Sequence, residues 1–279
     1  TDDKGSFDEQ LVTVTITGTN DGVTITAGST DASGAVTEDA AVLNGKLTDS
    51  GAIVFNDIDL IDVHTTSVTP AVGNSLGGTL VMGAVSESAT TAAGTVGWTY
   101  EVNNSAVQYL AADQTTTESF TVTISDGNGG TVTQLVTVTI TGTNDGVTIT
   151  AGSTDASGAV TEDAAVLNGK LTDSGAIVFN DIDLIDVHTT SVTPAVGNSL
   201  GGTLVMGAVS ESATTAAGTV GWTYEVNNSA VQYLAADQTT TESFTVTISD
   251  GNGGTVTQLV TVTITGTNDG VTITAGSTD

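Results

Sequence analysis

The chain has 279 residues and no cysteine, and it is strongly acidic: Asp and Glu number 32, Lys and Arg only 3, and the formal charge is -29. With so few basic residues to neutralise phosphates, this composition argues against nucleic acid and against direct binding or insertion at an anionic membrane. The lack of cysteine excludes disulfides, zinc–thiolate sites and a thiol nucleophile. Divalent cations are the natural counter-charge for so acidic a chain.

An internal repeat organises the sequence. Residues 10–155 are identical to residues 134–279, so the chain repeats with a period of 124 residues. This period is too long for a solenoid unit and suits a self-sufficient domain. We therefore interpret 1–21 as the C-terminal strand of a preceding repeat, 22–145 and 146–269 as two identical modules, and 270–279 as the start of another.

Alternation of apolar and polar residues predicts an all-β fold. In VTVTIT, Val12, Val14 and Ile16 alternate with Thr, which places one face of a strand on a core and the other in solvent. Seven or so strands per module suit an immunoglobulin-like β-sandwich. Within the first module we expect strands at 23–27, 41–47, 63–69, 78–85, 94–102, 118–125 and 131–141.

The segment ESFTVTISDGNGGTVTQLVTVTI predicts a β-hairpin. Its DGNGG centre supplies residues that tolerate positive φ between two alternating runs. Trp98 and Tyr100 are two residues apart on one expected strand and should share a face. We expect them to lie in the core, facing Phe120, Val122 and Ile124.

The acidic motif FNDIDLID at 55–62 is the main candidate for chemistry. Asp57 and Asp59 are two residues apart, so in an extended segment their carboxylates face the same way and repel unless a cation lies between them. A cluster that offers only oxygen suits Ca2+, which takes about 6 to 8 oxygen ligands. The alternative is a solvated acidic loop.

Three further acidic or amide sites recur once per module: Asn20 with Asp21, Glu38 with Asp39, and Asp126 in the DGNGG turn. Each has a local alternative, since a turn Asp before Gly commonly caps its own backbone and a Thr-Glu-Asp triplet commonly lies at the surface. A sandwich would place all of them at strand ends, next to the connection between modules.

Several motifs together resemble the bacterial VCBS repeats, relatives of cadherin-like domains in giant RTX-type repeat adhesins. They are VTEDA at 36–40, FNDIDLIDVHT at 55–65, GWTYEV at 97–102, and SDGNGG followed by GTND. The resemblance covers nearly the whole period. It implies cadherin-like Greek-key β-sandwiches joined end to end, with Ca2+ at each junction stiffening a spacer that holds an adhesive region away from the cell surface.

The resemblance also implies which residues bind the metal. Asn20, Asp21, Asp57, Asp59 and Asp126 would share a first junction. At the second, Glu38 would face the copies of these residues, and Glu162 would pair with the next linker. Compared with cadherins, the linker GTND lacks an upstream Asp, and VTEDA lacks proline, so we expect one or two ions per junction. The further ligands are Asn144, Asp145, Asp181, Asp183, Asp250, Asn268 and Asp269.

The sequence does not favour an enzyme. His64, copied as His188, has Thr65, Thr66 and Asp62 nearby, which only superficially offers hydroxyl, imidazole and carboxylate. No nucleophile elbow or HExxH motif accompanies it. We expect a polar histidine at a strand edge and no catalytic residue.

The resulting hypothesis is a non-catalytic, monomeric segment of a bacterial surface protein, exported by type I secretion and used in attachment and biofilm formation. Its partners are neighbouring identical repeats, and its only cofactor is Ca2+. The main alternative is a module that binds glycan or protein and gains avidity by repetition. A flat Thr-x-Thr face that binds ice or carbohydrate is a weaker alternative, because alternating Thr is typical of any solvated strand face. The sequence contains no run of about 18 apolar residues, so it predicts no membrane-spanning helix. Its first ten residues, TDDKGSFDEQ, lack the basic and apolar regions of a secretory signal.

Overall fold

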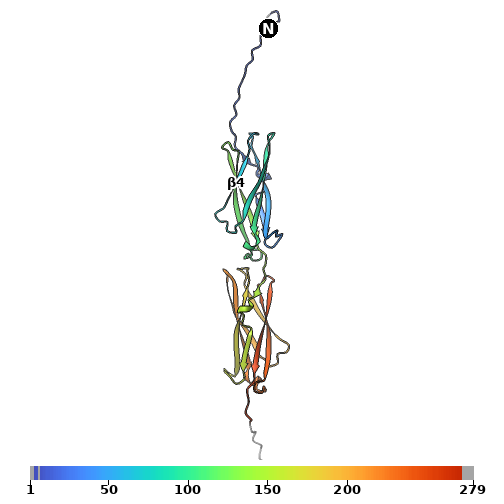
Figure 1. Cartoon of the computed structure of the whole chain (residues 1–279), viewed down its shortest axis with the longest axis vertical. Coiled ribbons are helices and arrows are strands. Elements are labelled where there is room, and N and C mark those ends of the chain that lie inside the picture. Colours follow the sequence, from blue (N-terminus) through green and yellow to red (C-terminus); the bar gives the residue numbers. More distant parts are fainter. Residues whose placement is uncertain (1–2, 6, 272–279) are drawn as a thin grey trace, which may run out of the picture. The chain divides into compact units, whose positions relative to one another are not determined.

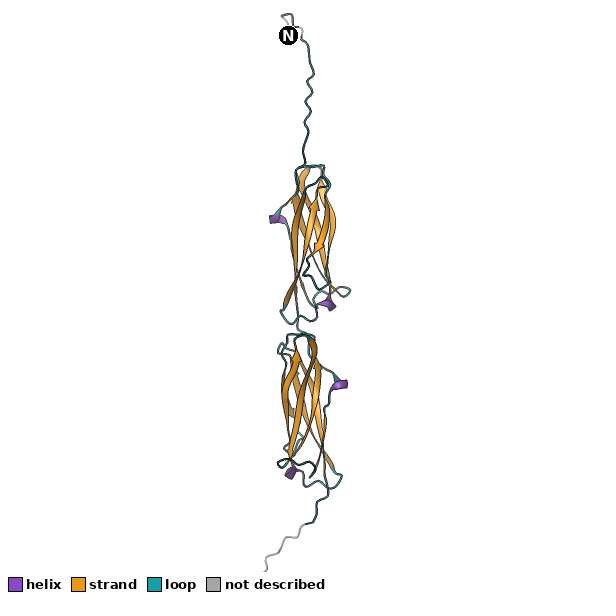
Figure 2. Ribbon diagram, turned by 90° about the vertical axis from the view of Figure 1, so that its left-hand side faces the viewer, coloured by secondary structure: helices purple, strands orange, loops and turns teal. Residues whose placement is uncertain are grey.

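The computed structural model describes residues 3–5 and 7–271, and about half of the chain lies in β-strands. The helical segments are 3-10 turns of three residues that lie outside the sheets (Figure 2). No helix in the described residues is long and apolar enough to cross a membrane. These turns are η1 Ala27–Ser29, η2 Asn104–Ala106, η3 Ala151–Ser153 and η4 Asn228–Ala230.

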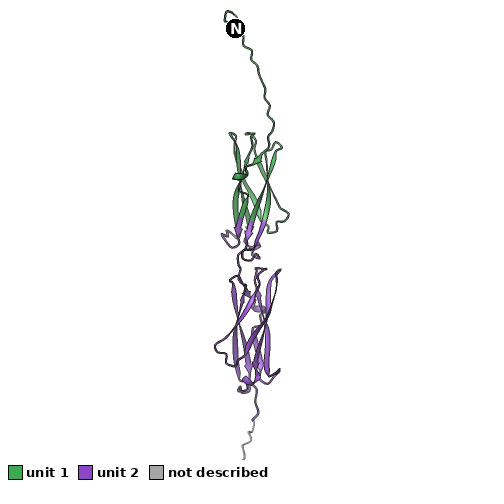
Figure 3. Ribbon diagram, turned by 180° about the vertical axis from the view of Figure 1, so that it is seen from behind, with its two compact units in different colours: residues 1–34, 48–101, 118–138 green, residues 35–47, 102–117, 139–279 purple. Residues whose placement is uncertain are grey.

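The chain divides into two compact units (Figure 3). The first comprises residues 1–34, 48–101 and 118–138, and the second comprises residues 35–47, 102–117 and 139–279. The second unit therefore contains the whole second repeat together with the segments at one end of the first. Those segments carry Glu38, so the predicted second junction lies inside a single unit.

The second repeat forms two four-stranded sheets. One has the order β9-β11-β14-β13 and the other the order β10-β16-β15-β12. The pairing of β10 with β16 is parallel, and the other described pairings are antiparallel. The strands are β9 Thr148–Ile149, β10 Ser157–Thr161, β11 Lys170–Asn180, β12 Thr189–Pro194, β13 Thr203–Ser212, β14 Thr215–Asn227, β15 Thr239–Ser249 and β16 Thr255–Thr265.

The first repeat has the same two sheets, with the orders β1-β3-β6-β5 and β2-β8-β7-β4. Figure 1 shows the strands of each repeat as two layers. Its strands are β1 Thr24–Ile25, β2 Ser33–Thr37, β3 Lys46–Asn56, β4 Thr65–Pro70, β5 Thr79–Ser88, β6 Thr91–Asn103, β7 Thr115–Ser125 and β8 Thr131–Thr141.

This strand order is that of an immunoglobulin-like Greek key. The chain passes from one sheet to the other between β3 and β4 and returns between β4 and β5, whereas β5 pairs with β6, and β7 with β8, within one sheet. The N-terminal segment contributes an edge strand to each sheet: β1 lies at the edge of one sheet and β2 at the edge of the other. The predicted class, tandem all-β sandwich modules, is confirmed.

The core lies between the two layers, as the alternation of the strands predicts. Trp98, Tyr100, Phe120, Val122 and Ile124 are all fully buried, as expected. In the second repeat, the Trp222 indole donates a hydrogen bond to the Asp155 carbonyl at 2.7 Å. Gly175 gives this indole room, since a Cβ there would lie 2.6 Å from a ring carbon of Trp222.

The predicted strand at 41–47 is wrong. Residues 39–45 form turns in which Asp39, Ala41 and Asn44 have positive φ, and β3 begins only at Lys46. β3 then continues to Asn56, through a stretch for which the sequence predicts no strand. The five-residue β2 was also missed. The hairpin of β7 and β8 and the other predicted strands are present within a few residues of their expected bounds.

The lead-in before the first repeat forms no strand in its described residues. Val12, Val14 and Ile16 are exposed, whereas their copies Val136, Val138 and Ile140 are fully buried in β8. The sequence is identical, so the difference comes from the partners: residues 12–16 have no neighbouring strand to pair with. Residues 1–2, 6 and 272–279 of the two predicted partial repeats lie outside the described residues.

Candidate metal centre

The acidic loop at 57–63 joins β3 to β4 and is held by a tight turn. The Asp59 N–H donates to the Asp57 carboxylate at 2.9 Å, and the Asp62 N–H donates to the Asp59 carbonyl at 3.0 Å. The segment is therefore not the extended strand that we expected. The turn nevertheless gathers the carboxylates: Asp57, Asp59 and Asp62 each offer an oxygen within 4.8 Å of the others.

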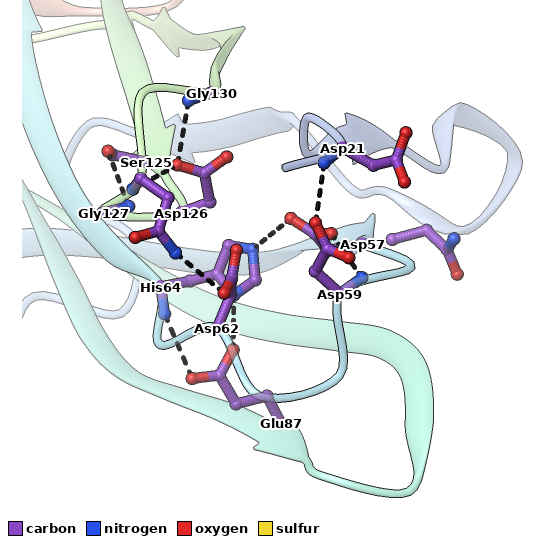
Figure 4. Close-up of polar contacts among 12 residues, drawn as sticks. Asp21, Asp57, Asp59, Asp62, His64, Glu87, Ser125, Asp126, Gly127 and Gly130 are labelled. Atoms are coloured by element: carbon purple, nitrogen blue, oxygen red, sulfur yellow. Dashed lines mark hydrogen bonds and ion pairs between the residues drawn. The ribbon is translucent and has the colours of Figure 1, made fainter. Parts of the chain in front are cut away.

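The DGNGG turn between β7 and β8 brings a fourth carboxylate beside this loop (Figure 4). One oxygen of Asp126 accepts the N–H groups of Asn128 and Gly130 at 2.8 and 2.9 Å, which is the backbone cap considered above. The Asn128 amide donates to Asp62 at 2.8 Å, which ties the turn to the acidic loop. Gly130 is required here, because a Cβ would overlap the Asp126 carboxylate.

The linker residues close the cluster of the first unit. The Asn20 amide donates to Asp126 at 3.1 Å, and the Asp21 N–H donates to Asp59 at 2.6 Å. The hydrogen bond from Asn20 is the main cause that lowers the pKa of Asp126, assisted by the backbone donors of its turn. The structure thus brings together all five residues assigned to the first junction.

The same arrangement recurs in the second unit. The Asn144 amide donates to Asp250 at 3.2 Å, and the Asp145 N–H donates to Asp183 at 2.7 Å. Asp181, Asp186 and Asp250 each offer an oxygen within 4.8 Å of the others. Asp62 and its copy Asp186 were absent from the ligands assigned from sequence, although they close the FNDIDLID motif.

Glu38 joins the second cluster from the end of β2. It is fully buried, and it accepts the Thr143 N–H at 3.0 Å and the Gln108 amide at 2.6 Å. Its charge interacts with those of Asp145 and Asp183. Carboxylates of the first repeat and of the second therefore repel one another within the second unit.

The electrostatics of this cluster are unfavourable without a cation. Burial, followed by the repulsion of Asp145, Asp39 and Asp183, raises the pKa of Glu38 to about 7. Burial and the neighbouring aspartates also raise the pKa of Asp183 to about 7. The pKa values of Asp145 and Asp186 are raised for the same two reasons. Such shifts mark buried carboxylates whose charged form is disfavoured by lost hydration and by neighbouring negative charge.

Several buried oxygens of the cluster have no hydrogen-bond donor. In the second unit they belong to Asn144, Asp145, Asp183 and Asp186, and in the first unit to Asp62. Buried polar atoms are nearly always paired, and an unpaired carboxylate oxygen is costly. These atoms have the chemistry of ligands for a hard cation, so the donor set fits Ca2+.

His64 lies behind the acidic loop and is not the strand-edge residue that we expected. It is buried, with one ring nitrogen 3.1 Å from Asp57 and the other 2.7 Å from Glu87, and its ring packs against Phe55. His188 repeats these contacts with Asp181 and Glu211. Its partners are thus carboxylates rather than the hydroxyls of Thr65 and Thr66. Because Glu87 is 23 residues away, no local motif could reveal this contact.

The third predicted group is less complete in the described residues. Glu162 is buried, and it accepts the Thr267 N–H at 2.8 Å, as Glu38 accepts that of Thr143. Asn268 and Asp269 are exposed, and the Asn268 amide donates to the Asp269 carbonyl. One oxygen of Glu162 has no donor.

Comparison with solved structures finds cadherin extracellular domains. The chain is similar to protocadherin gamma B2 domains 1–5, with 14% identity, coverage of 91% of this chain and 41% of that chain, and a TM-score of 0.41. It is also similar to Drosophila N-cadherin EC1–4, with 14% identity, coverage of 89% of this chain and 50% of that chain, and a TM-score of 0.38. A third similar structure is mouse cadherin-23 EC22–24, with 13% identity, coverage of 89% of this chain and 67% of that chain, and a TM-score of 0.38.

The chain spans 42% of the zebrafish RET cadherin-like domains and 33% of the protocadherin gammaB4 extracellular domain, which it also matches. No protein-family model matches the chain. No curated protein matches it either. The β-sandwich assignment therefore rests on the strand order of the chain itself.

Proposed function

We propose that the chain is a spacer segment of a secreted bacterial surface adhesin, in which calcium bound between consecutive repeats fixes the junction. One observation carries the proposal: Glu38 of the first repeat is fully buried, and its charge is repelled by those of Asp145 in the linker and Asp183 in the second repeat. Burial and mutual repulsion raise the pKa values of these carboxylates. A bound cation would neutralise their charges and so stabilise the folded junction.

The residues divide into two groups of ligands. Asp181, Asp186 and Asp250 are close together and all belong to the second repeat. Glu38, Asn144, Asp145 and Asp183 come from both repeats and the linker and include three oxygens without a donor. The two groups suit the one or two ions expected from sequence. An ion in the second group would draw on both repeats at once, so its binding energy would oppose bending of the junction.

The surface location and the adhesin role are supported by the sequence. The VTEDA, FNDIDLIDVHT, GWTYEV and SDGNGG motifs resemble those of VCBS repeats in RTX-type adhesins. Identical tandem copies add length with each repeat, which suits a spacer that projects an adhesive region for attachment and biofilm formation. Export by type I secretion belongs to the same proposal.

Calorimetric titration of the metal-free chain with Ca2+ tests the binding step. We expect binding in the wild type and a loss of affinity in Asp183→Asn, which removes one charge from the junction. Asp237→Asn is the matched control: Asp237 is exposed and has positive φ, which Asn tolerates. A wild type that binds no Ca2+ would overturn the proposal.

Small-angle scattering with Ca2+ and with chelator tests the stiffening. We expect the maximum dimension to change when the metal is removed, because the carboxylates then repel and the junction bends. An unchanged maximum dimension would contradict rigidification. Glycan-array binding by the same chain would favour the alternative, a ligand-binding module that acts through avidity.

A further inference from the structure

Because the two repeats are identical in sequence, the exposure of each residue can be compared with that of its copy in the other repeat. A residue with the same local fold in both copies should have the same exposure, unless something covers only one of them. Val81 and Val205 are 60% and 59% exposed, and Val72 and Val196 are equally exposed. The copies thus match closely at positions away from the second junction.

Exposure differs in the acidic loop. Ile58 is 67% exposed and its copy Ile182 is 40% exposed, while Ile61 is 87% exposed and its copy Ile185 is 53% exposed. The linker does not cause this difference, because it makes the same hydrogen bonds to both loops. What differs is that the second loop is preceded by a complete repeat.

Exposure also differs in the turn that follows β6 and β14. Tyr233 is 65% exposed, whereas its copy Tyr109 is only partly exposed. Ala111 is buried, whereas Ala235 is exposed. Gln108, next to Tyr109, donates to Glu38, whose charge interacts with that of Asp183 in the second loop. The covered turn is therefore tied by a hydrogen bond to Glu38, which belongs to the same unit as the covered loop.

We propose that residues 108–111 and residues 182–185 form an apolar docking contact between consecutive repeats, with Tyr109 and its copies seating each repeat on the next. The inference rests on the proposed spacer function and adds to it a contact through the side chains of Tyr109, Ile182 and Ile185, none of which is a metal ligand. An aromatic ring against branched aliphatic side chains buries apolar area without requiring a cation. The partner is a second copy of the same module: the exposed Ile58 and Ile61 would receive such a tyrosine from a preceding repeat.

Chemical nitration of tyrosine tests whether Tyr109 is covered. Tyr100 and Tyr224 are buried, so the reactive phenols are Tyr109 and Tyr233. In the Ca2+-saturated chain, Tyr233→Phe leaves Tyr109 as the reactive phenol, and Tyr109→Phe leaves Tyr233. We expect Tyr109 to react about twofold or more slowly, in line with its smaller exposed area. Equal rates would overturn the proposal.

A reciprocal pair of variants identifies the covering surface. Ile185→Ser in the Tyr233→Phe background should speed nitration of Tyr109, whereas Ile61→Ser, the same change in the uncovered copy, should leave the rate unchanged. If both variants or neither speed nitration, the loop at 182–185 is not the partner and the proposal fails.

Calcium titration of the same variants separates this inference from the function on which it rests. If Ca2+ binds but Tyr109 and Tyr233 react equally, the docking contact is wrong and the metal junction stands. If Tyr109 is protected but no Ca2+ binds, the contact stands and the calcium proposal fails.

Discussion

At the scale of single residues, the core of each module contains a buried hydrogen-bonded tyrosine–glutamate pair that lies outside the candidate metal site. The Tyr224 hydroxyl donates to buried Glu242 at 2.8 Å, and Glu242 also accepts the Leu200 N–H at 2.9 Å. Burial, together with Glu242, raises the pKa of Tyr224. The phenol therefore stays protonated and remains the donor that the buried carboxyl group needs.

Removing this hydroxyl should destabilise the second repeat. In Tyr224→Phe the ring still fills its site, but one oxygen of Glu242 loses its donor, at a cost of about 1–3 kcal/mol. Chemical denaturation monitored by fluorescence measures the change. Tyr233→Phe removes an exposed hydroxyl and should change the free energy of unfolding by less than about 0.5 kcal/mol. Equal effects of the two variants would contradict this account.

The raised pKa values of Glu38 and Asp183 predict an unusual pH dependence. A carboxyl group whose pKa is higher in the folded state binds more protons there, so its contribution to stability is present at low pH. For Glu38 that contribution is lost as the pH rises from about 4.5 to about 7. In metal-free buffer, the melting temperature should therefore fall across this window.

Thermal unfolding followed by circular dichroism at several pH values measures this fall. Glu38→Gln removes one of the titrating groups and should flatten the metal-free profile. Saturating Ca2+ should remove the fall in the wild type, because a bound cation favours the ionised carboxylates. A metal-free melting temperature that rises between pH 4.5 and pH 7 would show that these groups do not titrate as described.

At the scale of elements, sequence patterns predicted strands well where alternation was long and failed where it was short. The β7–β8 hairpin has eleven residues in each strand and a glycine-rich turn, so its pattern is unambiguous. The five residues of β2 carry little periodicity, and the copy of β2 in the second repeat pairs in parallel with a strand distant in sequence. The segment at 41–47 is apolar at its start but does not alternate, and its residues with positive φ prevent a strand.

In the candidate site, too, some features could be predicted from local sequence and others could not. The acidic motif, the linker and Glu38 were each recognisable as local patterns, and the structure places them together. Two features were not predictable from local patterns: the turn within the acidic loop, which brings in Asp62, and the burial of His64 against Glu87. Both depend on contacts that only the folded sandwich creates.

The lead-in gives an element-scale prediction. Residues 12–16 and residues 136–140 have the same sequence, but only the second segment is paired within a sheet and buried. Its amides should exchange with solvent far more slowly, because exchange from β8 requires local or global unfolding. Hydrogen exchange measured by NMR resolves the two copies. Similar protection in both would mean that the lead-in pairs with another strand.

At the scale of the whole molecule, the net charge of -29 would be unfavourable if the acidic groups were spread evenly with no counter-ion. The fold instead concentrates many of them in two clusters, at the acidic loops of the two repeats. The clusters are not equivalent. The second receives Glu38 from a preceding repeat, whereas the described residues show no corresponding glutamate at the first.

This asymmetry predicts two unequal classes of calcium site in the 279-residue chain. The cluster at 181–186 has the additional carboxylate of Glu38 and is more deeply buried, since Asp183 is 1% exposed and Asp59 is only partly buried. An extra charged ligand raises affinity for Ca2+. Titration calorimetry should therefore resolve a tighter class, lost in Asp183→Asn, and a weaker class, lost in Asp59→Asn.

Glutamate variants test the origin of the tighter class. Glu38→Gln should weaken it by about tenfold or more, the scale of effect seen for single residues that support a metal site. Glu162→Gln is the same substitution in the second repeat, where no acidic loop faces the glutamate in the described residues, and it should leave both classes unchanged. If the two variants behaved alike, the tighter class could not depend on a carboxylate donated by the preceding repeat, and the spacer would lack the cross-repeat ligand that links calcium to stiffness.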